Sequence, residues 1–191
     1  MKKTGLIVVG VIVAVAVMLV GFFISTHNSI ITLEEKVDAE FSNIKVQLER
    51  RADLIPNLVS TVKGYVKHEE QVIKDITDAR EKMVNASNVK EMSEANQQLT
   101  TALNNLNVII ENYPDLKANE NFIALQDELA GTENRISTAR RDYNDAVKEY
   151  NTTIKKIPAS IIAGMMGKTD KDYFEVSDDS KNEVPSVDFN E

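Results

Sequence analysis

Two patterns of apolar residues divide this chain. From Gly5 to Ile24, twenty successive residues are uncharged and mostly apolar. A helix rises about 1.5 Å per residue, so this run spans roughly 30 Å, the thickness of a bilayer's hydrocarbon core. The run therefore predicts a transmembrane helix over residues 5–24, behind a short flank over 1–4. A cleaved signal peptide is the weaker alternative, because its apolar region has only about 7–15 residues and ends in small residues at a cleavage site.

The second pattern, beyond the apolar run, is helical periodicity. The longest stripe has an apolar or aromatic residue at every seventh position: Phe122, Leu129, Ile136, Tyr143, Tyr150 and Ile157. Heptads sustained over this length predict a long helix in coiled-coil-like packing. Shorter stripes cover 30–48, 55–83 and 92–113. Together the patterns predict an all-α fold, in which the N-terminal transmembrane helix is followed by an antiparallel four-helix bundle over residues 30–157.

The breaks between these helices have physical causes. Proline disfavours helical geometry in the residue before it, so Pro114 should end the third stripe, and a polar turn is expected at 85–88. At Pro56 two interpretations stay open. The helix could continue with a kink, or Asp53 could cap a new helix with Pro56 in its first turn. We favour the new helix, because a reversal there would let four stripes close on one core.

Charge is concentrated at the C-terminus. The formal net charge is −8, and residues 168–191 carry eight acidic residues and three lysines. Such a segment predicts a disordered, solvated acidic tail. Nucleic-acid binding depends on clusters of Lys and Arg, and the chain has no basic patch, so we expect no nucleic-acid partner.

A short apolar segment over 158–167 precedes this tail. It is too short to span a bilayer. It could cap the bundle, lie on the membrane or form a partner-binding patch, and the sequence leaves these roles open. The chain contains no cysteine, which excludes disulfides, thiolate nucleophiles and cysteine metal sites. Because no catalytic, nucleotide or metal motif is present either, we expect no catalytic residues, no cofactor and no metal.

Glu69 is the candidate site residue, because it occupies an apolar position of the 55–83 stripe. A carboxylate is costly to bury unless it is paired. We predict a buried polar pair between Glu69 and either Arg135 or Arg140, an arrangement that would fix the register of the helices. The alternative is a buried acid in a ligand-binding cavity.

The chain has two histidines, His27 and His68. A metal site needs three or four converging ligands, and no such cluster recurs at helical spacing. We interpret both residues as surface or structural histidines.

Three segments resemble the LemA family of bacterial membrane proteins. Residues 50–69 read RRADLIPNLVSTVKGYVKHE, residues 111–122 read ENYPDLKANENF, and residues 132–151 read TENRISTARRDYNDAVKEYN. The similarity runs in order from about Ile30 to Gly167. It implies a single-pass membrane protein with a four-helix bundle, and it brings no catalytic residues to carry over.

The orientation of the anchor depends on the charges that flank it. Lys2 and Lys3 precede the apolar run, whereas Glu34 and Glu35 come before the first lysine on the other side, Lys36. The positive-inside rule then predicts a cytoplasmic N-terminus and an extracytoplasmic body. The resemblance implies the opposite orientation, since the short N-terminus of LemA proteins is usually predicted to lie outside the cell.

These observations predict a membrane-anchored helical interaction or scaffold protein of the bacterial cell envelope, without catalysis. The lipid bilayer would contact residues 5–24. The protein partners are unknown, and a homo-oligomer is one alternative. The competing hypothesis is a ligand-binding helical bundle with a cavity near Glu69.

Overall fold

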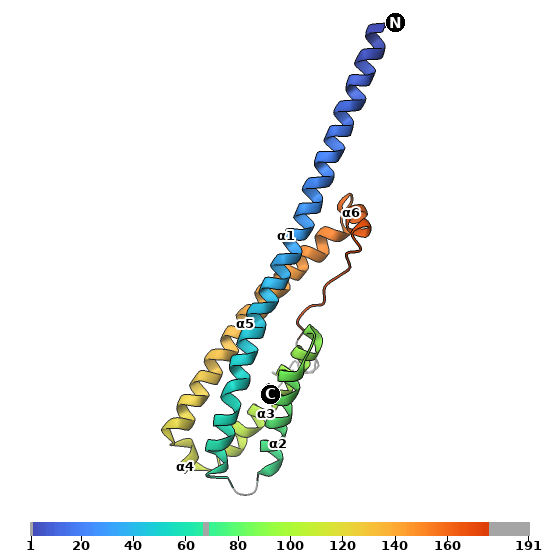
Figure 1. Ribbon diagram of the computed structural model, residues 1–191. Helices are drawn as coiled ribbons and strands as arrows, with labels where there is room; N and C mark the ends of the chain where they lie inside the picture. The colour runs from blue at the N-terminus through green and yellow to red at the C-terminus, as the bar shows by residue number, and fades with distance from the viewer. Residues whose placement is uncertain (1, 67–68, 176–191) are drawn as a thin grey trace, which may run out of the picture. The chain divides into compact units, whose positions relative to one another are not determined.

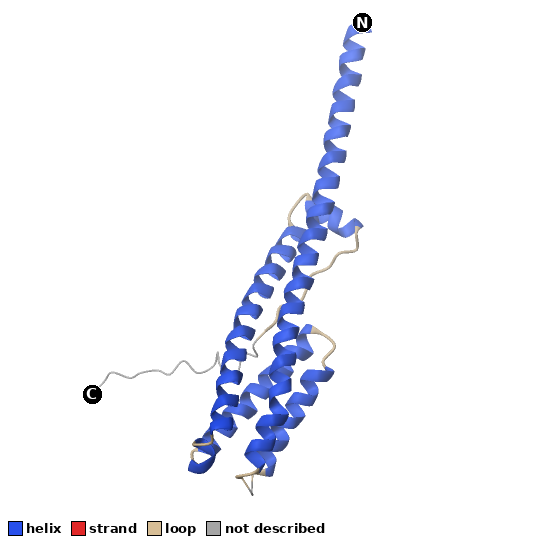
Figure 2. Ribbon diagram, turned by 60° about the vertical axis from the view of Figure 1, so that its left-hand side comes forward, coloured by secondary structure: helices blue, strands red, loops and turns tan. Residues whose placement is uncertain are grey.

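The computed structural model describes residues 2–66 and 69–175, with side chains from Leu6 onward. Every regular element in this part of the chain is a helix, which confirms the predicted all-α class (Figures 1 and 2). The elements are α1 (Lys2–Lys63), α2 (Glu70–Asn85), α3 (Val89–Ile110), α4 (Pro114–Lys117), α5 (Glu120–Lys155) and α6 (Ala159–Met165).

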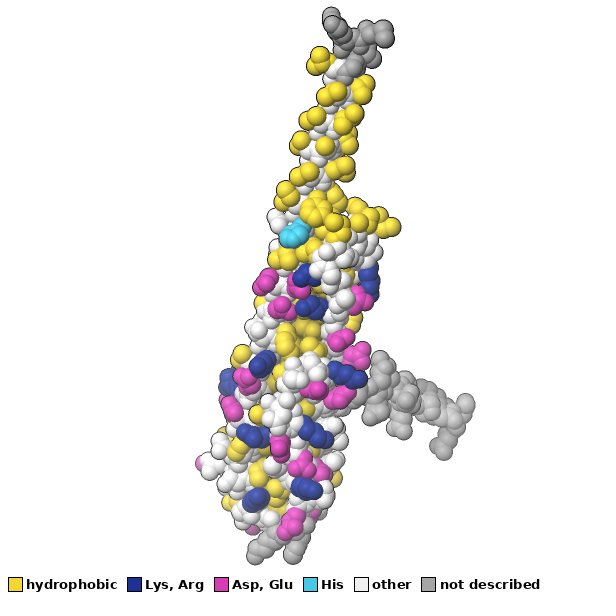
Figure 3. Space-filling view, turned by 45° about the vertical axis from the view of Figure 1, so that its right-hand side comes forward, with side chains coloured by type: hydrophobic (Ala, Val, Ile, Leu, Met, Phe, Trp, Pro, Cys, Tyr) yellow, Lys and Arg dark blue, Asp and Glu magenta, His cyan; other side chains and the backbone are white. Residues whose placement is uncertain are grey.

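The predicted transmembrane run forms the first part of α1. Its large apolar side chains, from Leu6 to Ile24, are 40–77% exposed. Figure 3 shows them as yellow side chains around the upper part of the molecule. By length and composition, α1 is the one helix among the described residues that could cross a membrane. Where the sequence predicts the anchor, the structure therefore has an apolar helix that the rest of the described chain leaves uncovered.

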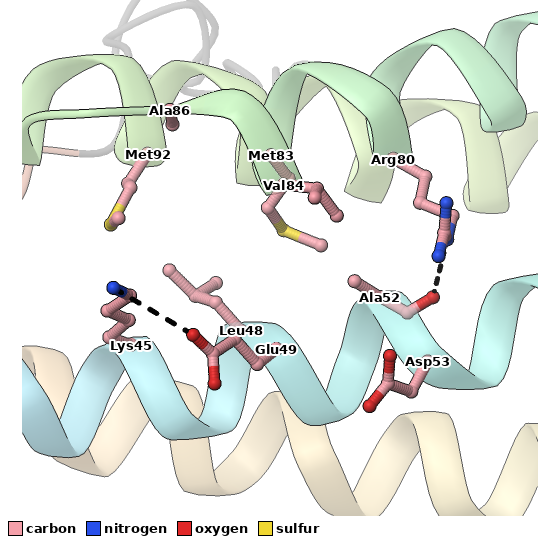
Figure 4. A pocket seen from close by; sticks show the side chains of 10 residues that line it. All are labelled: Lys45, Leu48, Glu49, Ala52, Asp53, Arg80, Met83, Val84, Ala86 and Met92. Carbon is pink, nitrogen blue, oxygen red and sulfur yellow. Dashed lines mark hydrogen bonds and ion pairs between the residues drawn. The ribbon is translucent and has the colours of Figure 1, made fainter.

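Helix α1 continues through Pro56 to Lys63, so the predicted new helix capped by Asp53 is wrong. Proline has no N–H, so it leaves the carbonyl four residues earlier without its helical donor. That carbonyl belongs to Ala52, and Arg80 Nε of α2 donates to it at 2.9 Å (Figure 4). A side chain thus replaces the hydrogen bond that the proline removes, and the helix persists. Its end lies a few residues later, where Gly64 N donates to Thr61 O.

The described chain forms two compact units, and α1 and α5 each contribute to both. The first unit combines residues up to Phe41 with Asp142–Lys171. Its buried apolar side chains come from α1, α5 and α6: Ile30, Val37, Tyr143, Ala146, Val147, Tyr150, Ile154, Ile162 and Ala163. The rings of Phe41 and Tyr143 lie 5.9 Å apart between centroids. Full burial in α1 begins at Ile30, the predicted start of the body.

Residues 168–171, the beginning of the predicted disordered tail, pack within this first unit. Lys168 forms an ion pair with Glu34. Asn151 of α5 exchanges two hydrogen bonds with the backbone of Lys171, both 2.9 Å long. This part of the tail is therefore ordered, contrary to the expectation, because its lysines and backbone find partners on α1 and α5. Residues 176–191 lie outside the described part of the chain.

The second unit contains residues Ser42–Arg141 and the segment that begins at Asp172. Helices α2 and α3 pack against each other and are joined by a short turn, as the polar residues 85–88 predict. Asn88 Oδ1 accepts a hydrogen bond from Glu91 N at 2.9 Å and so caps α3. Phe174 is buried against this unit, and Ser93 Oγ donates to the carbonyl of Glu175.

Helix α5 carries the predicted heptad stripe. Phe122, Leu129, Ile136, Tyr143 and Tyr150 are all buried. The last member, Ile157, is 85% exposed, so the prediction is wrong at its end. The helix stops at Lys155 because Pro158 follows, and the stripe has no helix left to continue on.

Candidate functional site

A buried arginine lies at the centre of the second unit. Arg51 of α1 is only 3% exposed. Its Nη1 lies 2.6 Å from Asn96 Oδ1 and 3.0 Å from Thr100 Oγ1, both on α3. The same nitrogen lies 2.6 Å from Glu133 Oε2 on α5. Arg51, Asn96, Thr100 and Glu133 form what we call the Arg51 cluster, which joins three helices through one guanidinium group.

Burial and charge act in opposite directions on this arginine. Burial lowers the pKa of the Arg51 guanidinium, and the negative charge of Glu133 opposes that shift. Arginine nevertheless stays protonated at neutral pH, so the cluster contains a fixed buried cation. Such a charge is tolerated only when a partner compensates it. Glu133, whose side chain is 40% exposed, is that partner.

The cluster is not fully satisfied. Arg51 Nε is buried without a hydrogen-bond partner, and Glu133 Oε2 lies at ion-pair distance but without hydrogen-bond alignment. Arg51 and Glu133 both line a hollow of about 370 Å³, whose polar lining also includes Thr100, Asn104 and Gln126. Amide, hydroxyl and charged groups around such a space can hold water or a small polar molecule. Proton transfer is not expected from the arginine, because it does not titrate near neutral pH.

A second hollow, also of about 370 Å³, lies between α1 and the end of α2 (Figure 4). Met83 and Met92 face Leu48 across it, and Arg80 reaches over it to the Ala52 carbonyl. Methionine side chains are flexible and polarizable, so they form adaptable apolar surfaces. The lining also includes the charged residues Lys45, Glu49, Asp53 and Arg80, so this hollow is a mixed polar and apolar packing feature of the α1–α2 contact.

Glu69, predicted to pair with Arg135 or Arg140, lies near Tyr113 instead. Glu69 is half-buried at the start of α2, and Tyr113 Oη donates to its Oε1 across a long 3.4 Å. Arg135 is exposed and Arg140 is half-buried. Among the described ion pairs, none joins Glu69 to either arginine. Because the helix ends at Lys63 and restarts at Glu70, Glu69 lies at a helix end rather than on a continuous stripe.

Of the two histidines, His27 lies among the described residues. His27 is half-buried on α1, with its ring 6.4 Å from that of Phe23 between centroids. His68 lies outside the described residues. Within 2–66 and 69–175, no group of three or more His, Cys, Asp or Glu side chains could hold a metal ion.

Sequence reasoning missed Arg51, although the signal was present. Starting at Ile30 and counting by seven along α1 gives Ile30, Val37, Ile44, Arg51 and Leu58, and all five are buried. Arg51 is therefore the polar member of a heptad stripe, a position known to fix register in coiled coils. The break predicted at Asp53 divided this stripe into predicted stripes over 30–48 and 55–83, and Arg51 lies between the two. A continuous helix would have identified it.

This chain is similar to one protein family and to several individual proteins. The model of the LemA family matches residues 40–189 of this chain. Magnetosome protein MamQ 1 of Paramagnetospirillum magneticum is 26% identical over an alignment of 194 residues. The alignment covers 86% of this chain and 71% of that protein. Magnetosome protein MamQ of Magnetospirillum gryphiswaldense is 25% identical, with 87% and 72% covered. Protein LemA of Metamycoplasma hominis is 23% identical, with 87% and 74% covered. Since the family model matches most of its length, this chain belongs to the LemA family.

Proposed function

We propose that this LemA-family chain is a membrane-anchored interaction protein of the cell envelope. Residues 5–24 cross the bilayer, and α1, α2, α3 and α5 form an antiparallel four-helix bundle that presents surfaces to protein partners. The observation that supports this most directly is α1 itself. One helix runs from Lys2 to Lys63, with apolar side chains exposed on all sides at its beginning and buried on one side later. A body attached through a continuous helix is held at the membrane surface.

The relatives carry different names. Proteins named for magnetosomes and a protein named LemA match about the same share of this chain, 86–87%. Proteins with different names therefore share most of the length of this chain. The charged outer surfaces of the body, visible in Figure 3, provide polar contacts of the kind that surround a docking site.

Site-specific photo-crosslinking of the full-length chain in bacterial membranes tests this role. The crosslinking residue is placed in turn at Val84 on α2, Val108 on α3 and Thr138 on α5, all exposed. A specific partner covers one face, so we expect discrete adducts from some positions and none from others. An even smear from all three would indicate crowding. Unmodified monomer at all three and at further exposed positions would contradict the proposal.

A ligand-binding function is the second candidate, and the Arg51 cluster favours it. Glu69 lines neither hollow described above, so we base this candidate on the hollow beside Arg51. A bound polar molecule could form hydrogen bonds with the polar side chains that line this hollow, among them Thr100, Asn104 and Gln126. Native mass spectrometry of the purified protein should then show a retained small molecule that is lost in Glu133→Leu. A melting temperature that no polar metabolite shifts would argue against this function.

For orientation we propose a cytoplasmic N-terminus, on the ground of Lys2 and Lys3. Protease added to intact cells, with any wall removed, should then digest the body and leave the anchor. A protected body would favour the opposite orientation that the family resemblance implies.

A further inference from the structure

The residues around α6 form an apolar surface outside the predicted transmembrane run. Ile157 is 85% exposed, Ile161 is 63% exposed and Met165 is 72% exposed. Ile161 and Met165 are four residues apart and so lie on the same face of α6. Ile162 and Ala163 are buried on the other face. The short helix is therefore amphipathic, with one face held by the protein and the other left open.

This surface lies beside the point where α1 changes from an exposed apolar helix to a packed one. Figures 1 and 2 both show α6 next to α1 below the exposed apolar segment. Contacts within the first unit fix it there. Lys168 N donates to the Ala163 carbonyl at 3.0 Å, and the Lys168 side chain pairs with Glu34 of α1. In Figure 3 the yellow side chains of the upper helix continue onto the neighbouring surface without a charged band between them.

The part of α1 between Ile24 and Ile30 is comparable in length to the polar interface of a bilayer. Full burial in α1 begins at Ile30, six residues after Ile24, which is about 9 Å along the helix. The polar interface on each side of the hydrocarbon core is roughly 5–7 Å thick. If residues 5–24 span the core, the residues immediately after Ile24 lie in this interface, and α6 is beside them.

We infer that α6 is an interfacial helix that inserts Ile157, Ile161 and Met165 into the same bilayer leaflet that α1 enters. This inference rests on the proposed anchoring of the chain. Amphipathic helices bury their apolar face about 5–10 Å into the boundary between headgroups and acyl chains. The body then contacts the membrane at two points, α1 and α6, and cannot rotate freely about the anchor.

The bilayer is the favoured occupant because the α6 surface is continuous with the lipid-facing part of α1. Charge does not drive the contact. Lys155 and Lys156 are exposed next to Ile157, but Lys155 is paired with Asp170 at 2.5 Å. Insertion should therefore occur in zwitterionic phosphatidylcholine vesicles and should be insensitive to salt.

Depth-dependent fluorescence quenching tests the inference on the full-length chain. The chain contains no cysteine, so a single introduced cysteine carries the only dye. I161C and M165C are labelled with an environment-sensitive dye in phosphatidylcholine vesicles that contain lipids with a nitroxide near the headgroup. T152C, exposed on α5, is the control for the aqueous surface, and L19C is the control for the anchor.

We expect I161C and M165C to emit at shorter wavelength and to lose most of their fluorescence to the shallow nitroxide, while T152C keeps its fluorescence. Quenching of L19C without quenching of either α6 position would overturn the interfacial helix and leave the anchor intact. Absence of quenching at L19C as well would contradict the anchor itself. A blue shift at I161C without nitroxide quenching would show that protein covers this face, which also overturns the inference.

Discussion

Helix α1 has two segments with different environments. From Leu6 to Ile24 its large apolar side chains are exposed all around the helix. From Ile30 to Val62 apolar side chains are buried along one stripe, and most of the remaining positions are exposed. The first segment has the distribution of a helix surrounded by lipid, whereas the second has that of a helix surrounded by protein on one side and water on the other.

The comparison shows that exposure of a single residue does not identify its solvent. Val13 in the first segment is 56% exposed, and Val46 in the second is 58% exposed. Val13 has only exposed apolar neighbours along the helix, whereas Val46 is flanked by Lys45 and lies between buried residues of the stripe. The surrounding pattern, rather than the exposed area, therefore predicts lipid around Val13 and water around Val46.

The largest expected effect is on membrane insertion, when charged residues are placed in each segment. Val13→Arg combined with Val17→Arg puts two charges in the middle of the predicted span. Each should cost about 2.5–3.5 kcal/mol of insertion free energy. The full-length variant should leave the membrane fraction on carbonate washing. Val46→Arg combined with Val84→Arg, at equally exposed valines of the body, is the matched control and should stay in the membrane. Equal behaviour of the two variants would remove the distinction between the segments.

The next largest effect is on the free energy of unfolding and concerns Arg51, the polar residue on the buried stripe of α1. Glu133→Leu leaves Arg51 as a buried charge without compensation and should lower the free energy of unfolding by about 3 kcal/mol. Glu128→Leu is the matched control, because Glu128 pairs with Arg50 at 2.8 Å in an exposed position. It should cost less than about 1 kcal/mol. Chemical denaturation of the full-length protein in detergent measures both.

A second variant separates the missing charge from the altered packing. Arg51→Met combined with Glu133→Leu replaces the whole pair by apolar groups, and most of the lost stability should return. If the double variant is as unstable as Glu133→Leu alone, the cluster contributes through shape and not through charge compensation.

Continuity of the two segments depends on the contact at Pro56. Arg80→Met removes the donor to the Ala52 carbonyl and leaves a part-buried acceptor unpaired, which should cost about 1–3 kcal/mol. Pro56→Ala restores the helical N–H to that carbonyl, so Arg80→Met should cost clearly less in this background. The coupling is measured as a double-mutant cycle on denaturation midpoints. Additive effects would show that Arg80 stabilises the protein in some other way.

The smallest expected effect is on the pH dependence of stability and concerns Glu34, near the boundary between the two segments. The hydrogen bond and charge of Lys168 hold the pKa of Glu34 below its ordinary value of 4.5. A depressed pKa in the folded state contributes stability above pH 4.5, and this contribution is lost as the pH falls through the lower folded value. Wild type should therefore lose up to about 1 kcal/mol more than Glu34→Gln between pH 6 and pH 3. Parallel stability curves for the two proteins would contradict the pairing.

Much of the fold follows from periodicity in the sequence. The buried residues of α5 from Phe122 to Tyr150 are those of the heptad stripe, and Pro114 and the turn at 85–88 separate helices as expected. These features are local, because they depend on spacing and on proline or polar residues at the break itself.

The errors arise where distant residues decide the outcome. Pro56 does not break α1, since Arg80, 28 positions away on the chain, supplies the donor that the proline lacks. Glu69 lies at a helix end, because the chain leaves the helix after Lys63, and none of the ion pairs among the described residues joins it to an arginine. The position of one helix end accounts for both observations: moving it from Asp53 to Lys63 places Arg51 on the buried stripe of α1 and takes Glu69 off the predicted 55–83 stripe.

The central claim is that one helix passes from lipid into the protein body between Ile24 and Ile30. Cysteine scanning of α1 tests it most directly, because the chain has no cysteine of its own. A membrane-impermeant maleimide is applied to full-length single-cysteine variants in opened membranes. We expect every position from 6 to 24 to be protected, and labelling beyond Ile30 to recur with helical periodicity, with Val37 and Ile44 protected and Val46 labelled. Labelling within 6–24, or the same periodic pattern along the whole helix, would contradict the claim.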